Sequence, residues 1–144
     1  MFEGFSAVWT PVLGAWQLKE DQLVAQEVAG TKVVFFRGPD GQPRALVDRC
    51  PHRGVALSLG KLVDGCVECP FHGWRFDGRG EVVRVPWNPD AKLAPLRGTS
   101  LPVRELGGLI WLFTSASETP KEEPRPAPIT LRDDVRVCGF AVDF

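Results

Sequence analysis

Both histidines of the 144-residue chain lie close to a cysteine. Cys50 and His52 form one pair with a single residue between them, and Cys69 and His72 form a second pair with two residues between them. Sixteen residues separate the two pairs. Thiolate and imidazole groups are ligands that zinc and iron centres take from proteins. The spacing therefore predicts one metal centre held by Cys50, His52, Cys69 and His72.

Proline and glycine shape the chain around each pair. A proline follows each cysteine, Gly54 follows His52 by two residues, and Gly73 follows His72 directly. Proline restricts the backbone, whereas glycine adopts a positive φ at no steric cost. Two such loops that face each other can present four ligands to one centre and bring backbone N–H groups close to its sulfur atoms.

Three interpretations of the two pairs compete. Core packing alone is disfavoured, because the pairs use every histidine in the chain. A Cys₂His₂ zinc site usually orders its ligands as a cysteine pair followed by a histidine pair, with at least two residues inside each pair. Here each half supplies one thiolate and one imidazole, which suits a two-iron centre in which two histidines replace two cysteines on one iron. A zinc-binding scaffold stays open as an alternative.

Short stretches rich in β-branched and aromatic residues alternate with turn signals along the chain. Residues 23–48 are expected to form a three-stranded meander, and an Asp-Gly turn predicts a hairpin over 75–83. No window has a helical period, so we expect an all-β domain. The strands expected outside the hairpin span residues 8–12, 23–28, 32–37, 44–48, 101–106 and 108–114.

Charge and hydropathy argue against several classes of protein. The 17 basic residues are balanced by 18 acidic ones, so we expect no nucleic-acid partner, because phosphate binding normally requires a basic excess. No apolar run approaches the roughly 20 residues that span a bilayer, so no membrane partner is expected. The first residues lack the basic and apolar regions of a signal peptide. A cytoplasmic location is therefore expected.

The composition of the chain changes after Thr114. Residues 115–128 contain four prolines and are expected to form a semi-rigid linker. Residues 129–144 include a strand-like run and are interpreted either as the start of a catalytic domain or as a C-terminal strand that folds back onto the same sheet. The metal-binding domain is expected to occupy residues 1–114.

The residues that flank the ligand pairs match a known family. Segments 50–54 (CPHRG) and 69–74 (CPFHGW), together with WTPV at 9–12 and GLIWLF at 108–113, resemble the N-terminal Rieske [2Fe–2S] domain of Rieske non-haem iron oxygenases, of the ring-hydroxylating and O-demethylase type. The resemblance covers about residues 8–114. It implies an antiparallel β-sandwich with an inserted cluster-binding subdomain made of two ligand loops.

The resemblance also implies one Rieske-type [2Fe–2S] cluster per chain. Cys50 and Cys69 would bind the buried iron, while His52 and His72 would bind the outer iron near the surface. A neutral imidazole in place of a thiolate makes the cluster less negative and localises an added electron on the histidine side. The implied electron donor is a flavin- and NADH-dependent reductase or a ferredoxin, and the implied acceptor is an oxygenase catalytic domain.

Other residues bear on the reduction potential. Val55 and Phe71 stand where high-potential Rieske proteins carry a disulfide, Trp74 stands where they carry a serine, and the chain has no tyrosine at all. Fewer hydrogen bonds to the cluster stabilise the added negative charge less. We therefore expect a potential near the low end of the Rieske range, about −150 mV.

Rieske oxygenases activate oxygen at a separate mononuclear iron, which is usually bound by two histidines and a carboxylate. This chain has no histidine beyond His52 and His72. We therefore expect the electron-transfer part of an oxygenase, with no oxygenase activity of its own and with no indication of the substrate. The alternative is a free-standing Rieske ferredoxin that serves a separate oxygenase.

Two cysteines lie outside the predicted ligand set. Cys66 is expected to be a half-buried thiol, and no functional argument applies to Cys138. Trp87 and Trp111 are expected to pack in the core or in a loop rather than to relay electrons.

Overall fold

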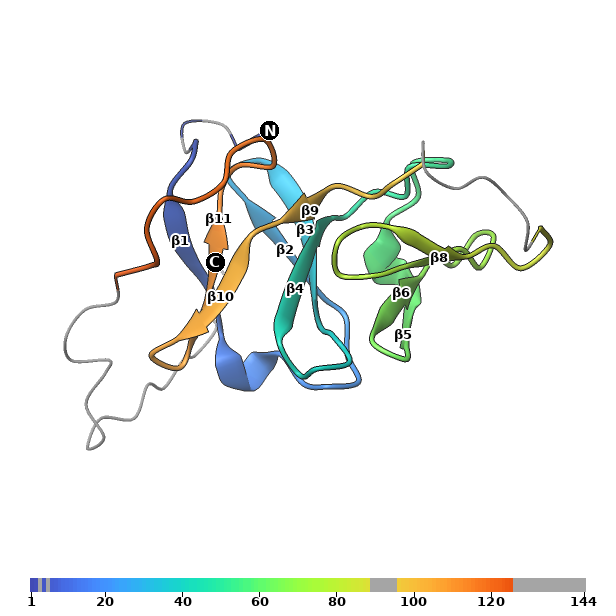
Figure 1. Cartoon of the computed structure of the whole chain (residues 1–144), viewed down its shortest axis with the longest axis horizontal. Coiled ribbons are helices and arrows are strands. Elements are labelled where there is room, and N and C mark those ends of the chain that lie inside the picture. The colour runs from blue at the N-terminus through green and yellow to red at the C-terminus, as the bar shows by residue number, and fades with distance from the viewer. Residues whose placement is uncertain (3, 5, 89–95, 126–144) are drawn as a thin grey trace, which may run out of the picture.

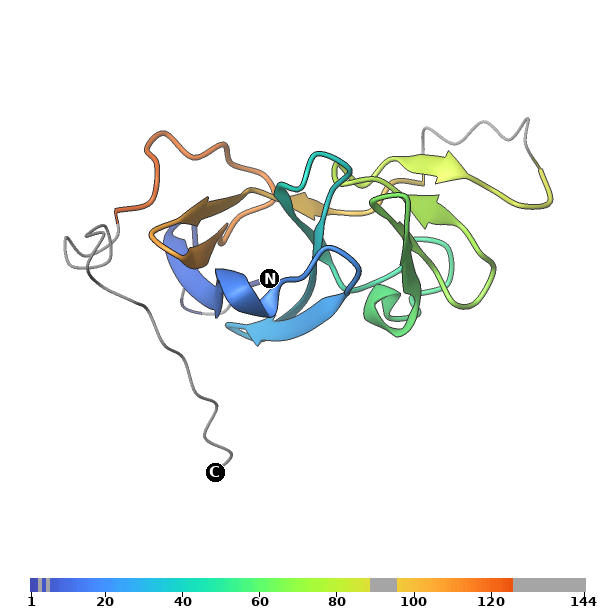
Figure 2. The same cartoon turned by 90° about the horizontal axis from the view of Figure 1, so that it is seen from below.

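The computed structural model describes residues 1, 2, 4, 6–88 and 96–125. Within these residues the chain forms eleven β-strands and two single-turn 3₁₀ helices. The strands build three antiparallel sheets, two in one lobe and the third in a second lobe beside it (Figures 1 and 2). The predicted all-β class, a β-sandwich with an inserted subdomain, is confirmed.

The first sheet brings together the first strand of the chain and the last two, because β1 pairs with β11 and β11 pairs with β10. The β10–β11 hairpin turns at Gly107 and Gly108, which have φ values of 63° and 74°. Both values lie in the left-handed region, which favours glycine. The strands of this sheet are β1 (Trp9–Gly14), β10 (Val103–Leu106) and β11 (Leu109–Phe113).

The second sheet contains the expected meander over residues 23–48. Its strand order is β2-β3-β4-β9, and every neighbouring pair is antiparallel. The short strand β9 returns the chain from the second lobe to the edge of this sheet. The strands are β2 (Val24–Val28), β3 (Thr31–Arg37), β4 (Pro43–Val47) and β9 (Ser100–Leu101).

Strand β3 supplies side chains to two separate hydrophobic cores. Val33 and Phe35 pack in the core between the first two sheets, with side chains of β10 and β11. Val34 and Phe36 point to the opposite face, because successive side chains of a strand alternate. All four side chains have an exposed fraction of 0%. The second core also contains Leu46, Cys50, Leu57, Val67, Cys69 and Phe76.

The second lobe is inserted between β4 and β9 and contains the third sheet, in the order β5-β6-β7-β8. It forms the green to yellow part of Figure 1. Its strands are β5 (Lys61–Val63), β6 (Cys66–Glu68), β7 (Arg75–Phe76) and β8 (Val82–Arg84). The 3₁₀ helices are η1 (Ala15–Gln17) in the first lobe and η2 (Leu57–Leu59) in the second.

The sequence predicted part of this lobe and missed the rest. The hairpin expected over residues 75–83 is present as β7 and β8, with a register shift between Arg75 and Phe76. Strands β5 and β6 were not predicted. Each has only three residues, too few for a recognisable period, but the Asp64-Gly65 turn between them, with φ values of 53° and 71°, is a hairpin signal of the kind that predicted β7 and β8.

The first part of the predicted linker lies against the first sheet. The Trp9 indole N–H donates to the Glu122 carbonyl oxygen at 2.6 Å, and the Arg104 guanidinium pairs with the Glu123 carboxylate at 2.9 Å. The predicted segment 129–144, with Cys138, lies outside the described residues. Among the residues that the structure describes, no helix is long and apolar enough to cross a membrane.

The two faces of β3 generate a matched pair of variants. Phe35→Leu and Phe36→Leu should each lower the free energy of unfolding by about 1–3 kcal/mol, because each removes part of a fully buried ring. Chemical denaturation followed by tryptophan fluorescence measures this loss. Only Phe36→Leu should also reduce the metal content of the purified protein, because Phe36 packs in the same core as Cys50 and Cys69.

Equal metal loss in both variants would contradict this division of the strand between two cores.

Candidate metal centre

The four predicted ligands lie on two loops of the second lobe. The first loop leaves the second sheet after β4 and carries Cys50 and His52. The second loop connects β6 to β7 and carries Cys69 and His72. Both loops therefore begin where a strand ends, so their cysteines lie close to the core and their histidines lie further out.

The two loops have the same backbone hydrogen-bond pattern. In each loop the cysteine N–H donates to the carbonyl oxygen five residues later, and the glycine N–H donates back to the cysteine carbonyl oxygen. These four bonds are Cys50 N to Val55 O at 2.8 Å, Gly54 N to Cys50 O at 2.8 Å, Cys69 N to Trp74 O at 2.8 Å and Gly73 N to Cys69 O at 3.0 Å. The structure thus repeats one turn geometry at both pairs, although the pairs differ in spacing.

The glycines of both loops have a positive φ, 74° for Gly54 and 67° for Gly73. Such values are costly for residues with a side chain. A Cβ on Gly73 would also lie 3.1 Å from Pro86 Cγ, which is closer than ordinary van der Waals contact. Glycine at these two positions is therefore required for the turn that follows each histidine.

The two thiols are buried in the second core, with exposed fractions of 3% for Cys50 and 2% for Cys69. Burial raises the pKa of the Cys50 thiol, the backbone N–H of His52 opposes this rise, and the neighbouring Cys69 thiol adds to it. A thiolate in such a core is unfavourable without a positive partner. The pair is therefore suited to a strongly Lewis-acidic metal, which binds thiolates and compensates their charge.

The two imidazole rings lie together on the outer side. Their centroids are 4.7 Å apart, and both residues are half-buried. Partial burial lowers the pKa of His52, and the nearby His72 and Arg53 lower it further. A neutral imidazole is the form that binds a metal.

An aromatic side chain packs against each of the two imidazole rings. Trp74 stacks on His52 with a centroid distance of 4.5 Å and an interplanar angle of 9°, and Phe71 contacts His72 at 4.0 Å. Trp74 therefore packs directly against the predicted ligand His52. Phe71 is 59% exposed, so this part of the second loop faces solvent.

The donors divide into a buried thiol pair and an outer imidazole pair. A mononuclear Cys₂His₂ zinc site needs four donors around one ion. A two-iron cluster spreads its ligands over two metal positions, with thiolates on one iron and imidazoles on the other. The residues present therefore fit a two-iron cluster better than a single ion.

The family model of the Rieske [2Fe–2S] domain matches residues 8–100 of this chain. The chain belongs to this family. A Rieske-type [2Fe–2S] cluster is therefore its cofactor, and the predicted resemblance to Rieske oxygenases is confirmed.

Rieske oxygenases are also found among the chain's curated relatives. Chlorophyllide a oxygenase of Chlamydomonas reinhardtii is 40% identical over 111 residues, which cover 77% of this chain and 17% of that protein. The oxygenase component of dicamba O-demethylase from Stenotrophomonas maltophilia is 42% identical over 97 residues, covering 67% and 28%. The Rieske domain described here thus spans less than a third of these relatives.

A solved structure of dicamba monooxygenase bound to dicamba has the same fold. The superposition covers 83% of this chain and 38% of the dicamba monooxygenase chain. Its TM-score is 0.74, and the sequence identity is 36%. The solved Rieske oxygenase structure and the family model both support the fold of this domain.

The remaining sequence-based expectations have mixed outcomes. Trp111 is 8% exposed and packs as expected, but Trp87 is 92% exposed, so its expected packing in a loop is wrong. Cys66 is half-buried in β6, and burial raises the pKa of its thiol.

The side chains that connect the two ends of each ligand loop could not be recognised from the sequence. Asp48 bonds to Ser58 below the first loop, and Glu68 pairs with Arg75 below the second. These contacts join residues seven and ten positions apart and have no local sequence signature.

Gly73 and Gly41 provide a test of the loop geometry. Gly73→Ala and Gly41→Ala should each cost about 1–2 kcal/mol, because both glycines have φ near 70°. Only Gly73→Ala should also lower the iron content, because a Cβ at Gly41 meets nothing within 4 Å and that turn lies away from the ligands. Iron analysis and chemical denaturation of the two purified variants measure these effects.

An iron content in Gly73→Ala equal to that in Gly41→Ala would show that the second loop does not need this backbone geometry.

Proposed function

We propose that Cys50 and Cys69 bind one iron of the cluster and that His52 and His72 bind the other. The burial of both thiols and the contact between the two imidazole rings support this assignment. The repeated hydrogen-bond pattern of the two loops supports it as well, because each loop then contributes one ligand to each iron.

The function that this arrangement supports best is electron transfer. The observation that carries it is the gradient of burial, from thiols inside the core to imidazoles at the surface. When bound, the cluster takes up and releases one electron at a time. His52 and His72 then provide the short route between the cluster and a docked partner, while the core residues around Cys50 and Cys69 exclude water.

We place the potential near the low end of the Rieske range, about −150 mV. Trp74 stacks on His52 and has no hydroxyl group to donate to a cluster sulfur. Val55 and Phe71 cannot form a disulfide between the loops. The reduced state therefore lacks these sources of stabilisation.

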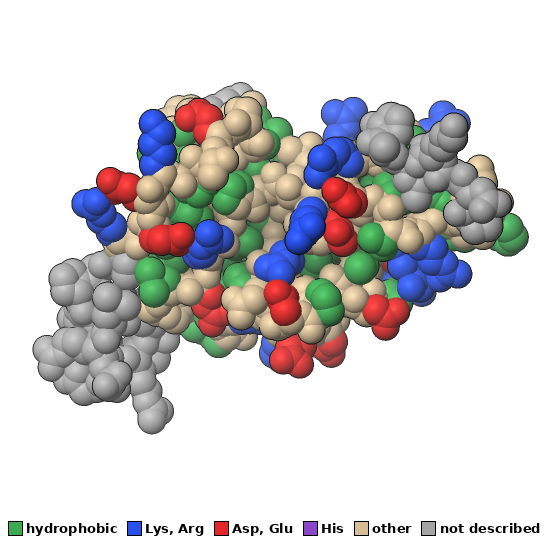
Figure 3. All heavy atoms as spheres, in the orientation of Figure 1, with side chains coloured by type: hydrophobic (Ala, Val, Ile, Leu, Met, Phe, Trp, Pro, Cys, Tyr) green, Lys and Arg blue, Asp and Glu red, His purple; other side chains and the backbone are tan. Residues whose placement is uncertain are grey.

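The surface around the imidazoles is suited to a protein partner. Phe71, which contacts His72, is an exposed aromatic side chain there, with an exposed fraction of 59%. Arg53, next to His52, is exposed, and within the described ranges it forms no salt bridge. On the face drawn in Figure 3, basic and acidic groups are interspersed. Exposed aromatic and arginine side chains are typical of protein interfaces.

We propose a flavin- and NADH-dependent reductase or a ferredoxin as the electron donor. The acceptor would be the mononuclear iron of an oxygenase catalytic domain. The histidine ligands of that iron must come from other polypeptide, because His52 and His72 are the only two histidines of this chain. The segment described here is therefore an electron-transfer part with no oxygenase activity of its own.

A free-standing Rieske ferredoxin is the second candidate. This chain covers only 17% and 28% of the two relatives described above. That coverage is compatible with an oxygenase domain and with a free-standing ferredoxin. A reading frame that continues with paired histidines and a carboxylate supports the oxygenase, whereas a stop codon followed by a separate oxygenase gene supports the ferredoxin.

A cytoplasmic location is part of the proposal. The relatives include chloroplastic proteins as well as a bacterial dioxygenase subunit from Comamonas testosteroni, so localisation of the tagged full-length protein in its own cells is the direct test.

Cysteine substitutions test the ligand assignment. Cys50→Ala should abolish the visible absorption and the paramagnetic signal of the reduced cluster, because one iron loses a thiolate ligand. Cys66→Ala should retain both signals, because Cys66 lies in β6 outside the ligand loops. A Cys50→Ala protein with a full complement of iron and sulfide would refute the assignment.

Potentiometric titration tests the proposed class of electron carrier. The midpoint of the purified, cluster-loaded protein should lie near −150 mV, because hydroxyl donors and a loop disulfide are missing. A midpoint above about +100 mV would place the domain with the high-potential Rieske proteins instead.

A further inference from the structure

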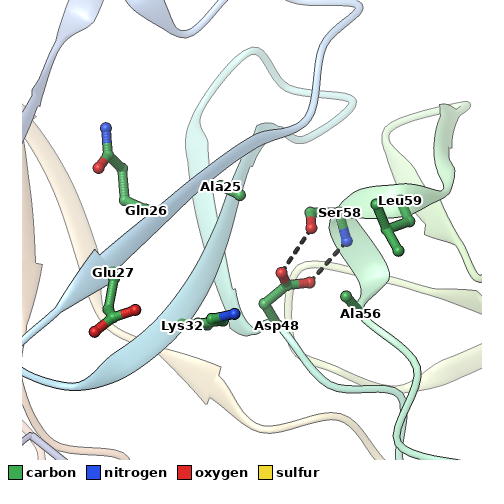
Figure 4. A pocket seen from close by; sticks show the side chains of 8 residues that line it. All are labelled: Ala25, Gln26, Glu27, Lys32, Asp48, Ala56, Ser58 and Leu59. Atoms are coloured by element: carbon green, nitrogen blue, oxygen red, sulfur yellow. Dashed lines mark hydrogen bonds between the residues drawn. The ribbon is translucent and has the colours of Figure 1, made fainter. Parts of the chain in front are cut away.

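A carboxylate closes the base of the first ligand loop. The Asp48 carboxylate accepts hydrogen bonds from the Ser58 backbone N–H at 2.7 Å and from the Ser58 hydroxyl at 2.6 Å (Figure 4). Asp48 precedes Cys50 by two residues, and Ser58 lies in η2 beyond the loop. The Asp48 backbone N–H donates to the Lys32 carbonyl oxygen at 2.9 Å. Asp48 therefore connects β3, the first ligand loop and η2.

A carboxylate also closes the second loop, but its electrostatic setting differs. Glu68 and Arg75 are cross-strand partners on β6 and β7, and the Arg75 Nε donates to the Glu68 carboxylate at 2.7 Å. Lys61 Nζ lies 3.2 Å from the same carboxylate. The hydrogen bond from Arg75 lowers the pKa of Glu68, and Lys61 adds to this effect. The negative charge of Glu68 is thus compensated by two cations.

The charge of Asp48 has no such compensation. Within the described residues it forms no salt bridge, and both of its hydrogen-bond donors are neutral groups of Ser58. Lys32 and Glu27 line the same cavity of about 390 Å³; the Lys32 amine points toward Asp48 without forming a salt bridge to it, and the Glu27 carboxylate points away (Figure 4). Both of these residues are exposed, whereas Asp48 is 8% exposed. Solvent screens exposed charges far more than a buried one.

Asp48 also lies close to the buried thiol pair. Two residues of extended chain span at most about 7 Å, so the Asp48 backbone lies within that distance of the Cys50 backbone. An uncompensated negative charge near a redox centre favours its oxidised, less negative state. At an effective dielectric constant of about 20, a unit charge at about 10 Å changes an equilibrium roughly tenfold.

We propose that Asp48 is a positioning residue that, with Ser58, fixes a negative charge beside the first ligand loop and thereby lowers the reduction potential of the cluster. The inference rests on the proposed assignment of Cys50 as a ligand. Glu68, which directly precedes Cys69, also fixes the backbone, but Arg75 and Lys61 compensate its charge.

Asp48→Asn tests the proposal on the cluster-loaded protein, because it removes the charge and keeps the size of the side chain. The midpoint should become more positive, and the ratio of reduced to oxidised cluster at a fixed potential should rise about three- to tenfold. Glu27→Gln is the matched control, because it removes the same charge from the same cavity at an exposed position. Its midpoint should equal that of the wild type.

Ser58→Ala separates charge from loop geometry. It removes the hydroxyl donor but keeps the Asp48 carboxylate, so the midpoint should stay close to the wild-type value while a chelator removes iron faster. An unchanged midpoint in Asp48→Asn, or equal shifts in Asp48→Asn and Ser58→Ala, would overturn the proposal.

Asp48→Glu decides the case in which Asp48→Asn does not retain a cluster. Recovery of the cluster with a wild-type midpoint supports a requirement for the charge, and failure of Asp48→Glu as well would refute it. Cys50→Ala distinguishes this inference from the proposed function. Loss of the cluster in Cys50→Ala together with an unchanged midpoint in Asp48→Asn refutes only the role of Asp48.

Discussion

A thiolate is poorly stabilised inside an apolar core, yet Cys50 and Cys69 are both buried in one. Neutral thiols are stable there. The thiolates that bind iron need a strongly positive partner, and the family's cluster provides it. The rest of the second lobe follows from this constraint. Its strands are short, its turns require glycine, and its two ligand loops repeat one backbone hydrogen-bond pattern.

The structural elements that have a local signature in the sequence could be predicted from it. Pair spacing and flanking proline and glycine indicated the ligand loops, and strand-like runs indicated the meander and the β10–β11 hairpin. The continuous run Val33–Phe36 also carried a signal that the sequence analysis did not use, because a strand without polar alternation is buried on both faces. Strands β5 and β6 were too short for any period to be visible.

The carboxylates below the loops could not be predicted for a different reason. Asp48 and Glu68 are equally unremarkable in sequence, since each is one acidic residue shortly before a ligand cysteine. Their roles depend on which partner the fold brings to them, a serine in one case and an arginine with a lysine in the other. The electrostatics around the centre is thus a property of tertiary contacts, whereas the ligand set is a property of the chain.

The double burial of β3 restricts how this domain can change over time. Most strands of a sandwich have one solvent-facing side on which substitutions are nearly neutral, and drift accumulates there. The four residues Val33–Phe36 have no such side. Every substitution in this stretch alters either the scaffold or the packing beneath the thiols, so we expect these four positions to vary among natural homologues only by volume-conserving apolar exchanges.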